Sequence, residues 1–290
     1  MALITEPVWA QDQEEASDTL PAVSAPNVKA AVNGGTVDSR ELFFVDASVS
    51  LPVLDQYGLQ LDGIAGTLDS DGFAGGAAHL FWRDPDIALV GLYGSTLFNT
   101  AGRNTTISNT GVTGALYLGM FSIEGTVGAQ FSNRRDTDIF ASTNLAVYPV
   151  DDLRLYGGYR HGFGQGAAAA GFEWQLPGND NSLGFSFFAD SRFREDDVMA
   201  FGGVRVYFGE NKTLIRRHRE DDPSLLMPDD VFLIDGILNG APAAGQQPPG
   251  EPDMCQGEWS QEYYEYCMYM IRDGMGPNGP GTIETVQPQT

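Results

Sequence analysis

Charged side chains recur at alternate positions through the middle of this sequence. Successive side chains of a strand point to opposite faces, so extended segments would gather these charges on their polar faces. They are Asp46, Asp62, Glu124, Glu173 and Asp190, together with Arg154, Arg160, Arg192 and Arg205. Carboxylates and guanidiniums removed from water need partners of opposite sign. The set predicts either an ion-paired interior that holds a fold in shape or a passage lined by both charges.

A second kind of chemistry, the hydrolysis of lipid esters, would need a nucleophile and a base such as Ser and His. The sequence has three histidines, His79, His161 and His218, and contains no G-x-S-x-G segment. The glycine cluster at 162–166 lacks the strand-to-helix context of a dinucleotide site, and the stretch 69–76 lacks the later acidic ligands of a calcium loop. The sequence therefore predicts no catalytic residue, metal or cofactor; a lipid-modifying enzyme is the less favoured alternative.

Eleven segments of about ten residues, each bounded by turn-forming residues, would carry these side chains. The segments are 41–51, 57–68, 73–82, 87–98, 106–118, 120–131, 139–148, 152–161, 166–176, 182–193 and 198–208. Connections such as DSDG, RDPD and PGNDNS are short. Strands joined this tightly must be antiparallel neighbours, because a parallel crossover needs about a dozen residues or more. The series predicts an all-β, up-and-down sheet.

The segment FSIEGTVGAQF, Phe121 to Phe131, shows the alternation most clearly. One face is apolar or small, and the other carries Glu124 and Gln130. The apolar face could pack on the core of a soluble protein or face lipid. With its apolar faces turned inward, a closed sheet of eleven or twelve strands would be hollow, because about eight strands is the size that side chains fill. A two-layer soluble sandwich avoids that problem and stays an alternative.

Segment length and aromatic placement favour lipid. The segments match the roughly 9–11 residues of a tilted spanning strand, and long crossovers typical of Greek-key sandwiches are missing from the series. Aromatic side chains gather near segment ends, as expected for interfacial girdles. The girdle candidates are Phe43, Trp82, Phe98, Phe131, Tyr148, Trp174 and Phe208. The sequence predicts a closed antiparallel transmembrane β-barrel of about 12 strands.

Single-chain bacterial barrels have an even number of strands, so a twelfth strand is expected. It falls within residues 25–39 around NVKAAV, or results from a division of the stretch 99–118, or is DVFLIDGIL at 230–238. The sequence pattern leaves these three alternatives open.

The regions on either side of the series are acidic and polar. Residues 1–39 are predicted to be a signal remnant with a disordered segment, residues 40–208 the barrel, and residues 209–290 a periplasmic tail with a short helix near 258–272. Cys255 and Cys267 form a candidate disulfide. The formal charge of −23 over 290 residues excludes a nucleic-acid partner held by phosphate neutralisation.

Four segments resemble a family of uncharacterised bacterial outer-membrane β-barrel proteins described as porin-like. They are GLQLDGIAG, GGAAHLFWRDPD, LRLYGGYRHG and VRVYFGENKTLIRRHREDDP. The resemblance covers about residues 42–223. It implies a bacterial outer-membrane location with periplasmic tails, outer-membrane lipids around the barrel, and no assigned reaction. The ending VRVYF at Phe208 looks like the final-strand signal read by the barrel assembly machinery. The tail is a candidate site for a periplasmic partner.

Together these patterns predict a structural or passive small-solute pore protein of the outer membrane without catalysis. A soluble β-sandwich that binds a ligand is the alternative from another class.

Overall fold

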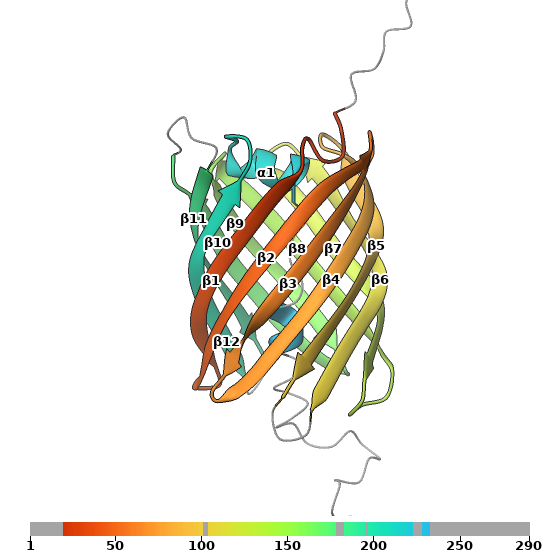
Figure 1. The fold of residues 1–290 in the computed structure, drawn as a ribbon, viewed down its shortest axis with the longest axis vertical. Coiled ribbons are helices and arrows are strands. Elements are labelled where there is room, and N and C mark those ends of the chain that lie inside the picture. Colours follow the sequence, from red (N-terminus) through yellow and green to blue (C-terminus); the bar gives the residue numbers. More distant parts are fainter. Residues whose placement is uncertain (1–19, 101–103, 178–182, 195–196, 223–227, 233–290) are drawn as a thin grey trace, which may run out of the picture. The chain divides into compact units, whose positions relative to one another are not determined.

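The computed structural model describes residues 20–100, 104–177, 183–194, 197–222 and 228–232. Within them, twelve antiparallel strands form a closed barrel in which each strand pairs with its neighbours in sequence and β12 closes on β1 (Figure 1). The strands are β1 (Asn27–Val37), β2 (Arg40–Leu54), β3 (Tyr57–Leu68), β4 (Asp71–Asp84), β5 (Ala88–Asn99), β6 (Thr105–Leu118), β7 (Phe121–Ser132), β8 (Asp138–Val150), β9 (Leu153–Gly162), β10 (Gln165–Gln175), β11 (Leu183–Phe193) and β12 (Val198–Phe208). The helix α1 (Leu214–Glu220) follows them. The up-and-down barrel predicted from the sequence is confirmed.

The twelfth strand is β1, which comes from the first of the three candidate stretches. It pairs with β2 and β12 along its whole length, for example Ala30 with Ala47 and with Val206. The stretch 99–118 is not divided, and Asp230 lies in a helical turn. The barrel therefore begins at Asn27, and not at residue 40 as the sequence predicted. The eleven predicted segments correspond to β2–β12.

The apolar face of the strands points outward. In β7, the outward Ile123 and Val127 are 46% and 48% exposed, whereas the inward Ser122, Thr126 and Gln130 are buried. The same parity holds around the barrel, as the exposed large hydrophobic side chains show: most of them are Val, Leu, Ile and Phe on its outer surface. This arrangement is that of a membrane barrel, in which lipid solvates the apolar face and the polar face lines the lumen. No helix in the described part of the chain is long and apolar enough to span a bilayer.

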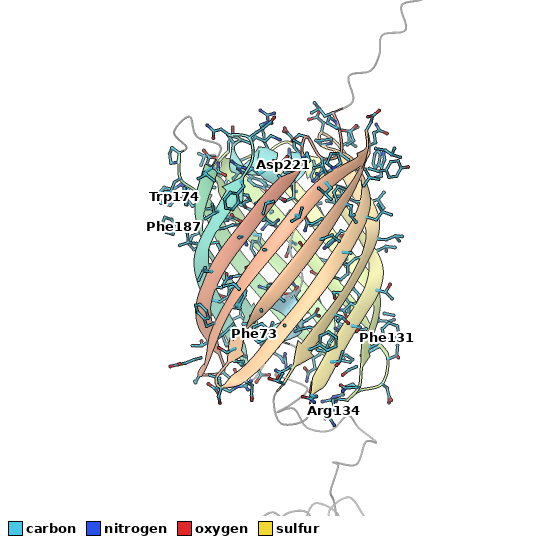
Figure 2. The ribbon with its side chains drawn as sticks, in the orientation of Figure 1. Phe73, Phe131, Arg134, Trp174, Phe187 and Asp221 are labelled. Atoms are coloured by element: carbon cyan, nitrogen blue, oxygen red, sulfur yellow. The ribbon has the colours of Figure 1, made fainter. Side chains whose placement is uncertain are left out.

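Five of the seven girdle candidates, Phe43, Phe98, Phe131, Trp174 and Phe208, are exposed on the outer surface. Figure 2 shows Trp174 projecting from the barrel beside Phe187, its partner across the β10–β11 pairing. Trp82 is half-buried, and its indole donates to the Gln56 side chain at 3.1 Å.

The girdle prediction for Tyr148 is wrong. Tyr148 is 3% exposed and points inward, because it shares the parity of Phe140, Ser142 and Ala146 on β8. A position near a strand end identifies an aromatic residue as interfacial only when its parity also places it on the outer face.

The interior also contains an apolar cluster that the alternation did not predict. Its members are inward side chains of several strands together with two residues of the helical turn at 228–232. The larger ones are Phe44, Leu68, Phe73, Leu97, Ile107, Phe188, Met199 and Phe201, with Val231 and Phe232 from the turn. Phe44 makes an edge contact with Phe201 at 5.2 Å between ring centroids. The lumen is thus partly filled by hydrocarbon as well as by polar groups.

A charge placed in the middle of the outer surface tests that this surface meets lipid. Leu92, near the middle of β5, and Ile87, in the turn before it, are each 61% exposed. We expect Leu92→Arg to lower the free energy of unfolding in lipid vesicles by about 2–4 kcal/mol and Ile87→Arg by about 0–1 kcal/mol, because the cost of a cation falls toward the interface. Urea titration followed by heat-dependent gel mobility measures both values. Equal and small losses would show that this surface lies in water.

Candidate functional site

All nine charged residues singled out in the sequence point into the barrel, where they are buried or half-buried. Four of them pair from wall to wall. The Arg154 guanidinium of β9 donates to Glu124 of β7 at 2.8 Å, and Arg205 of β12 donates to Glu173 of β10 at 2.6 Å. The Tyr207 hydroxyl also donates to Glu173, at 2.7 Å. Each pair spans one intervening strand, so each of these charges is compensated within the wall itself.

Asp46 on β2 and Asp62 on β3 have amide partners. The Asn33 side chain donates to Asp46 at 2.7 Å, and the Gln60 side chain donates to Asp62 at 2.7 Å. Nε2 of His79 lies 3.0 Å from the second oxygen of Asp62. His79 is thus a buried neighbour of a carboxylate inside the lumen and not a group at the lipid surface.

The remaining three charges meet a segment that follows the barrel. We call the helical turn at residues 228–232 the plug; it lies inside the barrel and is visible between the strands in Figure 1. Asp229 of the plug accepts from Nε of Arg160 at 2.7 Å and from Nε of Arg192 at 2.5 Å. Arg192 is paired with Asp190 as well. One carboxylate from the plug therefore bridges two arginines of the wall.

The rest of the plug is held by amide, hydroxyl and apolar contacts. Asp230 accepts from Asn109 at 2.8 Å and from Ser95 at 3.3 Å. Phe232 joins the apolar cluster, and the Arg194 guanidinium lies 4.3 Å from the centre of its ring. Sequence reasoning missed the plug. The signal was the segment DDVFLI, in which two consecutive acids directly precede an apolar run, because such a segment can contact both the arginines and the apolar cluster of the lumen.

Residues 20–26 and 210–222 cover the mouth where β1 begins and β12 ends, and we call them the lid. Backbone hydrogen bonds tie the lid to the turns of this rim, from Ala22 to Asp55 at 2.7 Å and from Ile215 to Asp151 at 2.9 Å. Arg219 donates to the carbonyl of Gly119 at 2.6 Å. The sequence predicted residues 209–290 as a tail; of the described parts of this region, residues 210–222 are instead folded onto the barrel and residues 228–232 form the plug. The reason is that the charges of residues 210–222 find partners in the rim and do not merely neutralise one another.

Arg83 of β4, which sequence reasoning did not select, is fully buried beneath the lid and contacts both of its segments. Its Nε donates to the carbonyl of Ala22 at 2.6 Å, and its Nη2 donates to the carbonyl of Asp221 at 3.2 Å. One wall residue thus joins both halves of the lid. Lys212 adds a contact of 2.8 Å to Asp221. Arg83 continues the inward parity of His79 and Phe81, so extending the strand by one residue would have found it.

His218 of α1 lies among polar groups of the wall. Its Nδ1 is 2.9 Å from the Tyr148 hydroxyl, and its Nε2 is 3.3 Å from the Tyr207 hydroxyl. Burial lowers the pKa of His218 to about 3. Glu173, 3.7 Å away, raises the pKa of His218, but its charge is already compensated by Arg205. The effect of burial on this pKa is therefore the larger one, and His218 is neutral near pH 7.

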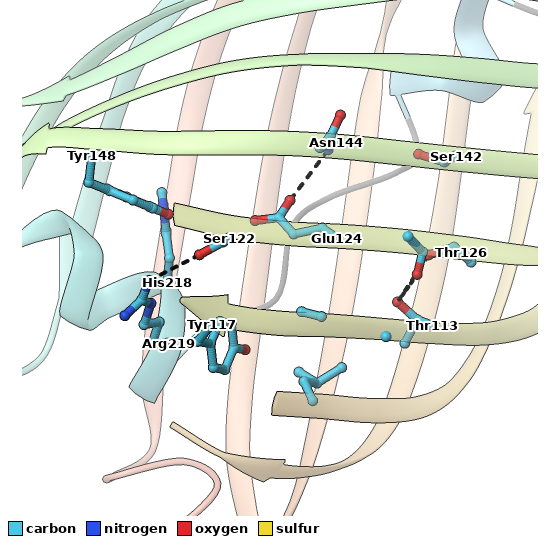
Figure 3. Close-up of a pocket in the computed structure, with 14 residues that line it drawn as sticks. Thr113, Tyr117, Ser122, Glu124, Thr126, Ser142, Asn144, Tyr148, His218 and Arg219 are labelled. Carbon is cyan, nitrogen blue, oxygen red and sulfur yellow. Dashed lines mark hydrogen bonds between the residues drawn. The ribbon is translucent and has the colours of Figure 1, made fainter. Parts of the chain in front are cut away.

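The cavities of the described lumen include three small ones. The first, about 40 Å³, lies between α1 and the β6–β8 wall, where Thr113, Ser122, Thr126 and Ser142 face it (Figure 3). The second, about 30 Å³, lies beside the plug, and the third, about 80 Å³, lies among the charged residues. A water molecule occupies about 30 Å³ in the liquid, so each holds a few waters at most.

Within the described ranges, no group of three or more His, Cys, Asp or Glu side chains is arranged to hold a metal ion. Cys255 and Cys267, the helix predicted near 258–272 and residues 1–19 lie outside the described residues.

No protein-family model and no curated protein matches the chain. Solved structures of similar fold include the KdgM porin, with 8% identity, a TM-score of 0.48 and coverage of 63% of this chain and 99% of that chain. The COG4313 outer membrane channel from Pseudomonas putida F1 has 10% identity and a TM-score of 0.45, covering 66% and 98%. Outer membrane phospholipase A from Escherichia coli has 10% identity and a TM-score of 0.42, covering 69% and 95%. At this level of similarity, the comparisons carry no argument about activity.

Removing the Arg83 guanidinium tests its place in the lid. We expect Arg83→Met to lower the opening free energy of residues 210–222 by about 1.5–3 kcal/mol, because two buried carbonyls lose a charged donor. Hydrogen exchange measured on this segment reports that value. Arg216, whose side chain is 60% exposed and paired with Glu220, provides the control. Arg216→Met should change the opening free energy by about 1 kcal/mol or less. Equal effects of the two substitutions would remove Arg83 from its central role.

The pKa of His218 predicts that the lid loosens in mild acid. The folded lid favours neutral His218, so its contribution is complete above the ordinary pKa of about 6.5 and declines as the pH falls toward about 3. At pH 5.5 the loss should be on the order of 1 kcal/mol relative to pH 8. Hydrogen exchange of α1, corrected for the intrinsic pH dependence, measures it.

The groups that surround His218 are Tyr148, Tyr207, Glu173, Glu124, Arg154 and Lys29. His218→Gln is the control, since it cannot titrate, and it should remove most of the difference between pH 8 and pH 5.5. An unchanged difference in this variant would assign the effect to the carboxylates of the lid.

Proposed function

We propose that this protein is a bacterial outer-membrane β-barrel that passes small solutes only when its lid and plug have moved, and that the described state is closed. The observation that carries the proposal is the contact between wall and plug: Arg160 and Arg192 of the lumen both donate to Asp229, a residue outside the strands. A barrel built only for rigidity could pair Arg160 within its wall, as Arg154, Arg205 and Arg192 are paired with Glu124, Glu173 and Asp190. A separate segment in the lumen supports a passage that can open.

The outer membrane is the location that supports this proposal best, because single-chain barrels with an apolar outer face belong to it. With twelve strands, β1 begins and β12 ends at the same rim, and we propose that this rim, with the lid, faces the periplasm. Recognition of the β12 ending by the assembly machinery and a periplasmic partner for the tail remain predictions. The proposal includes no catalytic step.

Both closures lie in the path of a solute. The apolar cluster includes Val231 and Phe232 of the plug, and a cavity of about 40 Å³ lies between α1 and the β6–β8 wall. Such a cavity holds a few waters at most, so a solute needs α1 to move. We therefore expect the full-length protein to be silent most of the time in a membrane and to conduct in rare steps.

Single-channel recording in a planar bilayer tests the proposal. We expect Phe232→Ala to raise the open fraction by about tenfold or more, because truncation of a buried Phe costs about 3 kcal/mol of plug docking. Phe131→Ala, which removes an equal side chain from the outer surface, should leave the open fraction unchanged. If neither the correctly folded wild type nor the correctly folded Phe232→Ala variant gives current steps, the pore is rejected and a purely structural role is left.

A further inference from the structure

The contact between Asp229 and the wall has the geometry of a ligand in a site. Its two carboxylate oxygens accept from two different guanidiniums, Nε of Arg160 on β9 and Nε of Arg192 on β11. Charge-assisted hydrogen bonds of this kind are short and strong. The carboxylate bridges two strands that are not neighbours, since β10 lies between them.

The wall, and not the plug, sets the position of both arginines. Nη1 of Arg160 donates to the carbonyl of Thr143 at 2.9 Å and to that of Tyr159 at 3.2 Å. Nη1 of Arg192 donates to the carbonyl of Ser191 at 3.2 Å and is paired with Asp190. These contacts do not depend on Asp229, so the two Nε donors stay in place when the plug leaves. A site that keeps its geometry without its occupant loses little affinity to reorganisation.

The strand between the arginines leaves room for a carboxylate. In the register of the sheet, Ala167 of β10 is opposite Arg160 and Ala169 of β10 is opposite Arg192. Both alanines are buried on the inner face. A larger side chain at either position would fill the space between the two guanidiniums. The short side chains of β10 therefore form a lane with a cation on each side.

The charge of the adjacent cavity also favours an anion. Its lining includes five cationic residues, Lys29, Arg154, Arg160, Arg192 and Arg205, and three carboxylates, Asp46, Glu173 and Asp190. Arg154 and Lys29 are paired with Glu124 and Asp222, which lie just outside this lining. Among the described residues, the ion pair of Arg160 is made by Asp229, so the departure of the plug leaves this guanidinium to be compensated by another anion.

We infer that Arg160 and Arg192 form a binding site for small carboxylates, and that Asp229 is its intramolecular occupant. The inference rests on the proposed function, because a solute reaches the site only when the plug has left. A bound carboxylate prevents Asp229 from returning, so the solute competes with the plug and prolongs the open state. The structure thus assigns to the lumen both a class of solute and the means by which that solute keeps it open.

Calorimetric titration of succinate into the folded Asp229→Ala protein in detergent tests the site directly. We expect saturable binding in this variant and at least about tenfold weaker apparent binding in the wild type, where Asp229 competes. Adding Arg160→Gln or Arg192→Gln to Asp229→Ala should weaken binding by roughly 30-fold or more, because each removes one partner of a charged hydrogen bond. Adding Arg216→Gln, the same change of charge at an exposed position of the lid, should leave binding unchanged.

Heat-dependent gel mobility verifies that each variant is folded. If Asp229→Ala does not fold, Asp229→Asn, which preserves the shape of the side chain, replaces it with the same expectations. The competition is tested in the wild type by single-channel recording, where succinate should lengthen open events and potassium chloride of the same ionic strength should not.

Absence of succinate binding in the folded Asp229 variants, or binding that persists unchanged without Arg160 and Arg192, would overturn the inference even if the barrel conducts. Binding that depends on both arginines in a protein that never conducts would support the site and reject the pore. The two proposals therefore fail in different ways.

Discussion

A barrel of twelve strands encloses more space than its own inward side chains can fill, and the rest of this structure follows from that constraint. About eight strands is the size at which side chains close the interior. With the apolar faces directed to lipid, the lumen also receives the polar groups, which need partners. The chain meets both requirements with segments outside the strands: the lid at one mouth and the plug within. These segments are part of the interior and not appendages of the barrel.

The two kinds of ion pair in the lumen have different consequences. Arg154 with Glu124 and Arg205 with Glu173 join wall to wall, so they persist in every state that keeps the barrel closed on itself. The pairs that Asp229 makes with Arg160 and Arg192 join wall to segment and are exchangeable. Separating a buried pair leaves charges without compensation, which is costly unless another charge replaces the lost one. A carboxylate solute supplies that replacement, and a neutral solute does not.

The alternation of side chains was sufficient to predict the closed barrel, the outward apolar face and the inward position of all nine charges, because parity follows from strand geometry alone. It was insufficient where parity and composition disagree. Tyr148 is an aromatic residue near a strand end, as girdle residues are, but its parity on β8 directs it into the lumen, and parity decides its position. β1 was one of three candidates for the twelfth strand, because it lies in a region, residues 1–39, whose overall acidic and polar composition is that of a tail.

The lid and plug could not be predicted from periodicity, since neither has a strand or a long amphipathic helix. The self-neutralising run LIRRHREDD reads as a solvated segment until the rim is present to receive Arg217, Asp221 and Asp222 in buried positions. Contacts that form between segments distant in sequence leave no trace in local spacing. The bond from Arg83 to the carbonyl of Asp221 spans 138 residues, for example. The sequence determines such contacts through the completed wall, and not through any neighbouring residues.

In the proposed passage, the lid and the plug are two closures in series, and this arrangement determines how the passage can be controlled. If the lid and the plug open independently, the open fraction is the product of the two separate fractions, so a barrier of a few kcal/mol at each makes the passage almost permanently closed. The lid is anchored through backbone hydrogen bonds to two turns of the rim, whereas the plug is held by side-chain contacts. A carboxylate that competes with Asp229 can act on the second closure only. Protonation of His218 acts on the first, and a stimulus that opens the barrel fully must therefore combine the two.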